Sequence, residues 1–137
     1  MFLTKKVIRV ASSSETSFKH ASFLIDKKGN RFFLSCNDFA FHSEINTLNK
    51  LRKYMESRGY SQRKMKRKIK TLVMVNVRIL RQGKLVANSK PCKHCLDELK
   101  RVGLKKVIYT ECNKYEVEKV RDMENEHITM FRRSYDW

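Results

Sequence analysis

Four residues of this chain have types and spacing suited to zinc chemistry. Cys92 and Cys95 form a C-x-x-C pair directly after Pro91, and Glu44 follows His42 by two positions. One imidazole and two thiolates bind Zn²⁺ and leave its fourth position open to water, as in catalytic zinc sites. The sequence therefore predicts Zn²⁺ as a cofactor held by His42, Cys92 and Cys95. Glu44 is the predicted catalytic residue, because its carboxylate is then free to transfer protons.

Each half of this pattern also occurs in other settings. A C-x-x-C pair serves in structural zinc modules and in redox pairs, or as two small buried residues. A redox pair is disfavoured because no Trp precedes Cys92 and Pro91 is placed to begin a helix. Cys112 as a fourth ligand would close the site and make it structural, and that alternative stays open. Glu44, outside such a motif, would be read as a residue that stabilises a helix N-terminus.

Apolar residues recur with the period of helices in some segments and form strand-like runs in others, which predicts an α/β fold. His42, Cys92 and Cys95 fall at the starts of two predicted helices, whose exposed N–H groups would stabilise thiolates at one point. Helices are expected over 3–13, 42–58 and 91–102, and strands over 21–25, 31–36, 71–80, 106–110 and 115–120.

The last two predicted strands are separated by only four residues, 111–114. A parallel crossover needs a dozen residues or more. These strands are therefore expected to pair as an antiparallel hairpin.

The order of these motifs resembles the cytidine/deoxycytidylate deaminase superfamily, and most closely its small single-domain members such as those encoded by large DNA viruses. The resemblance runs from about residue 3 to about residue 123 and rests mainly on H-S-E at 42–44 and N-S-K-P-C-K-H-C at 88–95. It implies a three-layer α/β/α domain over residues 1–123, with a sheet of about five strands. The stretch between His42 and Pro91 departs from the resemblance, because it is longer than usual and contains a basic insert at 58–70. Residues 124–137 would form a C-terminal tail.

The resemblance also implies an activity, the zinc-dependent hydrolytic deamination of cytosine in a nucleoside, nucleotide or nucleic acid. Asn37 matches an asparagine that contacts the substrate sugar in relatives, although a turn-forming role is a close alternative. Phe39 could stack on a base or belong to the core. Ser89 could line the site or cap the following helix. Ser43 stands where many relatives have Ala, a departure that is harmless if its side chain points away from the metal.

Two features point to different branches of the superfamily. A hairpin of the last two strands resembles the free-cytidine deaminases. A histidine ligand at position 42 resembles the deoxycytidylate, tRNA-adenosine and polynucleotide-editing branches instead. The substrate branch therefore stays open, and a homo-oligomer is expected because relatives are commonly dimers or tetramers.

The chain is strongly basic, with 31 Lys and Arg against 14 Asp and Glu, which gives a formal net charge of +17. Segment 58–70 carries seven of these cations and no acidic residue. Such a charge excess predicts a polyanionic partner, either nucleic acid or an acidic protein neighbour. The predicted polyanion-binding residues are Arg58, Arg63, Lys64, Lys66, Arg67, Lys68 and Lys70.

The same charge supports an alternative function. The chain could be a structural or nucleic-acid-associated component of a large assembly such as a virus particle, with a retained zinc site. Its four cysteines suggest a reducing, intracellular compartment, or a virion if the protein is viral. No apolar run approaches the ~18 residues of a membrane span, so no span is expected.

Overall fold

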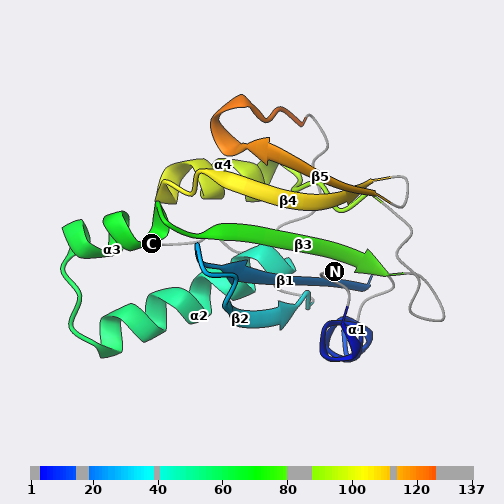
Figure 1. Ribbon diagram of the computed structural model, residues 1–137, viewed down its shortest axis with the longest axis horizontal. Helices are drawn as coiled ribbons and strands as arrows, with labels where there is room; N and C mark the ends of the chain where they lie inside the picture. Colours follow the sequence, from blue (N-terminus) through cyan, green and yellow to red (C-terminus); the bar gives the residue numbers. More distant parts are fainter. Residues whose placement is uncertain (1–3, 15–18, 39–40, 80–87, 112–113, 126–137) are drawn as a thin grey trace.

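The computed structural model describes residues 4–14, 19–38, 41–79, 88–111 and 114–125. Within these residues the chain forms an α/β fold in which four α-helices surround one mixed five-stranded sheet (Figure 1). The helices are α1 (Lys5–Ser12), α2 (Ser43–Ser57), α3 (Gln62–Ile69) and α4 (Lys93–Val102). The strands are β1 (Lys19–Ile25), β2 (Arg31–Cys36), β3 (Val73–Ile79), β4 (Lys106–Glu111) and β5 (Lys114–Lys119), followed by the short 3₁₀ helix η2 (Val120–Asp122).

The strands lie in the order β2-β1-β3-β4-β5. β1 is antiparallel to both of its neighbours, and β3 and β4 are parallel. β4 and β5 pair antiparallel, with Thr110 opposite Tyr115 and Glu111 opposite Lys114. The predicted hairpin at the end of the domain is therefore confirmed.

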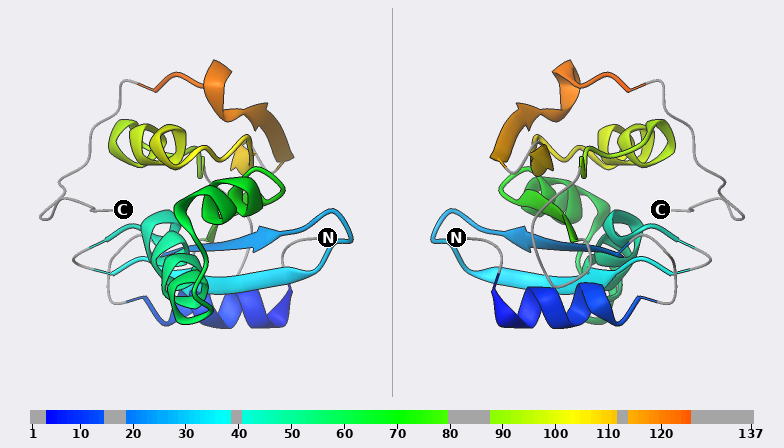
Figure 2. Two further views of the ribbon diagram at one scale, coloured as in Figure 1. Left: turned by 90° about the vertical axis from the view of Figure 1, so that its left-hand side faces the viewer. Right: turned by 90° about the vertical axis from the view of Figure 1, so that its right-hand side faces the viewer.

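The side chains of each strand alternate between two apolar clusters, one on each face of the sheet. Phe23 and Val75 belong to the cluster that contains Val7 of α1. Their neighbours Leu24 and Met74 belong to the cluster built by α2, α3 and α4. The strands accordingly separate α1 from α3 and α4 in the end-on views of Figure 2.

The basic segment 58–70 contains a helix packed on the core. No helix was predicted there, yet residues 62–69 form α3, which Ser61 caps by accepting a hydrogen bond from the Lys64 N–H at 3.2 Å. Met65 and Ile69 lie four residues apart, on one face of the helix, and both are buried in the core. The position of α3 therefore follows from its own apolar face and needs no partner to explain it.

Helix α4 ends at a glycine but begins later than expected, at Lys93 with Cys92 as its N-cap, so Pro91 precedes the helix and does not begin it. Gly103 adopts φ 87° at the C-cap of α4, a left-handed conformation that glycine adopts without steric cost. This glycine turns the chain from α4 towards β4, as the sequence predicts. Among the described residues, no helix is both long and apolar enough to cross a membrane.

Candidate metal centre

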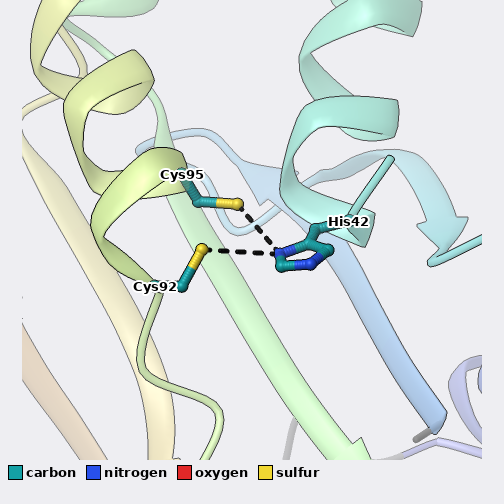
Figure 3. A group of neighbouring side chains, drawn as sticks. All are labelled: His42, Cys92 and Cys95. Carbon is teal, nitrogen blue, oxygen red and sulfur yellow. Dashed lines mark hydrogen bonds between the residues drawn. The ribbon is translucent and has the colours of Figure 1, made fainter. Parts of the chain in front are cut away.

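Two helix starts bring the three predicted ligands together. His42 is the N-cap of α2, Cys92 is the N-cap of α4, and Cys95 lies in the first turn of α4. The Nδ1 atom of His42 is 3.3 Å from Sγ of Cys95 and 3.6 Å from Sγ of Cys92 (Figure 3). Their potential ligand atoms all lie within 4.8 Å of one another, so the predicted cluster is present as a possible metal site.

The spacing of these atoms suits zinc. With Zn–S bonds of about 2.3 Å and Zn–N bonds of about 2.0–2.1 Å, a tetrahedral arrangement places nitrogen and sulfur ligands roughly 3.5–3.6 Å apart. The two N···S separations of 3.3 and 3.6 Å are close to that value. The donor set of one imidazole and two thiols is also one that zinc prefers. The residues therefore fit a zinc ion without a change of fold.

The environment of the cluster shifts the pKa values of its ionisable side chains. Burial raises the pKa of the Cys95 thiol well above 9.0, and Cys92 and Glu44 add to the increase. Burial opposes the charged form of His42, but its hydrogen bond with Cys92 and the charge of Glu44 together raise its pKa above 6.5. A metal ion must displace the protons on these groups, so the affinity for metal is expected to rise with pH.

Glu44 lies in the first turn of α2 with only 5% of its surface exposed. Burial raises its pKa above 4.5, although the charge of His42 and hydrogen bonds, including one from Ser43, act against that increase. Ser43 donates a hydrogen bond from Oγ to Oε1 of Glu44 at 2.9 Å. Ser43 therefore contacts the predicted proton carrier, a role that the sequence did not predict.

Ser43 belongs to a chain of buried polar side chains that links α2 to the adjacent strands β1 and β3. Its Oγ lies 2.7 Å from Oγ of Ser22 in β1. Ser22 in turn donates to Oδ1 of Asn76 in β3 at 2.6 Å. All three residues are buried. Because buried polar groups that lose a partner are costly, this chain holds the Ser43 hydroxyl, and with it the carboxylate of Glu44, in one orientation.

Ser89 occupies a structural position next to the metal centre. Its hydroxyl donates to the carbonyl of Asn76 at 2.9 Å and accepts from the N–H of Thr110 at 2.7 Å. Its own N–H donates to the carbonyl of Thr110 at 2.8 Å. Because the N-cap of α4 is Cys92, Ser89 does not cap that helix. It ties the segment before α4 to β3 and β4, and its contact with substrate stays a prediction.

Asn37 is buried at the end of β2, next to β1. Its Oδ1 accepts a hydrogen bond from the backbone N–H of His20 at 3.0 Å, and its carbonyl accepts one from Oγ of Ser14 at 2.7 Å. Burial, with help from the nearby charges of Arg78 and His42, lowers the pKa of His20 to about 4. A contact of Asn37 with the substrate sugar stays a prediction.

Other predicted residues lie apart from the ligands or beyond the described segments. Phe39 and Cys112 lie outside the described residues, so base stacking by Phe39 and a fourth zinc ligand from Cys112 stay predictions. Cys36 is half-buried, and its Sγ lies 3.7 Å from Oγ of Ser13. The seven predicted polyanion-binding residues are all exposed: Arg58 at the C-cap of α2, Lys70 at the C-cap of α3, and the other five within α3.

The sequence was also compared with known proteins. No model of a protein family matches the chain, and no curated protein matches it either.

Proposed function

We propose that the protein is a zinc-dependent hydrolase that deaminates cytosine in a nucleoside, nucleotide or nucleic acid. The observation that carries this proposal is the combination of three converging ligands with a buried carboxylate two residues after one of them. A structural zinc site needs no such carboxylate. The His-x-Glu and Pro-Cys-x-x-Cys pattern is that of nucleobase deaminases, in which the glutamate is not a zinc ligand.

The three ligand residues and Glu44 have distinct parts in this proposal. His42, Cys92 and Cys95 would hold the zinc ion, which when bound supplies a Lewis acid that lowers the pKa of water towards ~7. Glu44 accepts the proton that water loses as it attacks C4 of the ring and delivers it to the ring nitrogen. Ser43 orients the carboxylate during both transfers.

The overall reaction balances without any other reactant. One water molecule and one cytosine give one uracil and one ammonia, because a C–O bond forms at C4 and the C4–N bond to the amino group breaks. The raised pKa of Glu44 suits this role, since a carboxyl that must hold a proton during the reaction benefits from a pKa closer to neutral.

The fold is compatible with this function. The sheet order β2-β1-β3-β4-β5, together with the helix starts of α2 and α4 that meet at the metal centre, supports a three-layer cytidine-deaminase arrangement. We include that arrangement in the proposal. The antiparallel pairing of β4 and β5 favours the free-cytidine branch, whereas His42 as a ligand favours the other branches.

The experiment compares wild type with Glu44→Gln and with Glu116→Gln, an exposed glutamate of β5 that serves as the matched control. Zinc content is measured by mass spectrometry, and ammonia release is measured with cytidine, deoxycytidine, their monophosphates and single-stranded DNA. We expect about one zinc per chain in all three proteins. Turnover should fall by roughly 10²–10⁴-fold in Glu44→Gln alone, because only proton transfer is removed.

Three results would reject the proposal. Equal turnover of Glu44→Gln and wild type would exclude Glu44 as the proton carrier. A zinc-loaded wild type that releases no ammonia from any of the substrates would favour the alternative function, a structural or nucleic-acid-associated component of an assembly. The net charge of +17 supports that alternative. Cys92→Ser completes the set, and an unchanged zinc content in that variant would exclude the metal site itself.

A further inference from the structure

A groove lined by cations lies at the end of α4 that is remote from the metal centre. Lys100, Lys105, Lys106, Lys119 and Arg121 surround a cavity of about 630 Å³ whose lining also includes Leu104 and Val120. We call this cavity, with its five cations, the basic groove. α4 has ten residues, and at 1.5 Å per residue it separates its two ends by about 15 Å. The basic groove is therefore distinct from the site of His42, Cys92 and Cys95.

The cations of the basic groove are largely unneutralised. Among the ion pairs of the described residues, only Arg121 takes part, at 3.8 Å from its sequence neighbour Asp122, and both side chains are mostly exposed. An exposed pair of this kind contributes little. Lys105, Lys106 and Lys119 are exposed, and Lys100 donates to the carbonyl of Met123 at 3.1 Å. Five like charges around one cavity create a local field that attracts anions.

Strand pairing extends this field along a whole edge of the sheet. Ile25 pairs with Val73, Val73 with Lys106, and Lys106 with Lys119. One end of each of these strands therefore lies at the same edge of the sheet. At about 4.8 Å between strands, the edge from β2 to β5 spans roughly 19 Å. The connections at this edge add exposed cations, namely Lys27, Lys28, Lys68 and Lys70.

We propose that the basic groove binds the sugar–phosphate backbone of a nucleic acid, which then runs along this edge towards α3. Each strand of a nucleic acid carries phosphates at regular intervals, one per ~3.4 Å of axis in a duplex and more widely spaced in an extended single strand, so one strand places several phosphates along ~19 Å. A single phosphate would need far fewer cations than this edge provides. The partly apolar floor of Leu104 and Val120 suits the sugar rings between the phosphates.

Two other polyanions fit the surface less well. A bilayer presents a flat layer of headgroups, whereas these cations line a concavity. An acidic protein surface would need carboxylates at a matched spacing, whereas a nucleic acid supplies evenly spaced charge of any length. The proposal does not depend on the deaminase chemistry, because the groove and the metal centre share no residue.

The test uses two variants that remove the same number of charges. The groove variant carries Lys105→Gln, Lys106→Gln, Lys119→Gln and Arg121→Gln, and it leaves Lys100 in place because that residue also bonds to Met123. The matched control carries four exposed cations changed elsewhere, Lys5→Gln, Lys6→Gln, Arg9→Gln and Lys114→Gln. Binding of a fluorescein-labelled 20-nucleotide oligo(dT) is measured by anisotropy over a range of salt concentrations, and circular dichroism and zinc content check the fold.

The slope of log affinity against log salt should fall by about 0.7 for each phosphate of a single strand that the protein no longer neutralises, and so by about 2.8 in the groove variant. If the variant and wild type bind equally at 1 M salt, where electrostatic binding is negligible, the variant should bind roughly 600-fold more weakly than wild type at 0.1 M salt. The control should change the slope by less than about 1. If the groove variant does not fold, the double variant Lys105→Gln/Lys119→Gln should lower the slope by about 1.4.

Three results would overturn the proposal. Equal reductions of the slope in the groove variant and the control would show attraction by net charge alone. An unchanged slope in the groove variant would show that the groove does not contact the backbone. Binding to phosphatidylserine vesicles that depends on the groove, with undetectable binding to oligo(dT) at low salt, would identify a lipid surface instead.

Discussion

Replacement of Ser43 by alanine tests whether the buried polar chain orients the predicted proton carrier. Ser43 is fully buried, and it donates to Oε1 of Glu44 at 2.9 Å while its Oγ lies 2.7 Å from Oγ of Ser22. Ser43→Ala removes only the hydroxyl group. The substitution leaves no apolar cavity of consequence, so its effect reports the missing hydrogen bonds.

The expected magnitude follows from the charge of the acceptor. A hydrogen bond to a charged group contributes about 1.5–3 kcal/mol, and Ser43→Ala should therefore lower the free energy of unfolding by a similar amount. If the same bond holds the carboxylate in its reactive orientation, kcat should fall by roughly 10- to 150-fold, with KM nearly unchanged. Zinc content should stay at the level of wild type, because Ser43 is not a ligand.

Urea denaturation measures the stability, and ammonia release measures kcat and KM on whichever substrate wild type accepts. Ser57→Ala is the matched control, because Ser57 also donates a hydrogen bond within α2, to the carbonyl of Tyr54 at 2.7 Å, but is exposed. It should change the free energy of unfolding by less than about 0.5 kcal/mol. A Ser43→Ala protein with the stability and kcat of wild type would show that the polar chain does not position Glu44.

Two further predictions concern the core and β1. Ile69 is 1% exposed, so Ile69→Ala should lower the free energy of unfolding by about 2–5 kcal/mol in urea denaturation, whereas the exposed Lys68→Ala should change it by less than about 0.5 kcal/mol; similar values for the two would show that α3 is not packed on the core. His20 should titrate near pH 4 by NMR of its imidazole, because burial disfavours its charged form. Since this pKa lies below 6.5, its contribution to stability is present above about pH 6.5 and is lost as the pH falls towards about 4. A measured pKa of about 6 or higher would contradict this environment.

The metal cluster was predictable because its residues are marked by local signals. Pro91 before Cys92, and Gly103 after Val102, define a short helix from the sequence alone. A ligand at a helix start has its direction fixed by that start, so two helix starts suffice to predict one convergence point. The pairing of β4 and β5 was predictable for a similar reason, since a short connection permits a single arrangement.

The role of Ser43 could not be read from the sequence. Residues i and i+1 do not face each other on a helix surface, so no spacing rule predicts that Ser43 contacts Glu44. The contact depends on Ser22 and Asn76, which come from two different strands and meet Ser43 only in the folded sheet. Single polar residues in strands carry no signal that would identify them as parts of one chain.

Helix α3 was missed because its apolar signal is short. Only Met65 and Ile69 mark its buried face, and they stand among five cations within eight residues. The basic groove was missed for a different reason. Lys100, Lys106 and Lys119 are spread over a long segment in which lysine is common, and strand pairing, rather than sequence spacing, gathers them.

Helix α4 gives the two proposed sites a common physical origin. Its N-terminal end carries Cys92 and Cys95, and the positive end of the helix dipole favours thiolates there. Its last turn carries Lys100 and Arg101, and the negative end of the dipole favours cations there. One helix thus stabilises an anionic ligand set at one end and part of a cationic surface at the other. Because the dipole acts mainly within the first and last turns, substitutions at one end should leave the other end unaffected, and the metal centre and the basic groove can be tested independently.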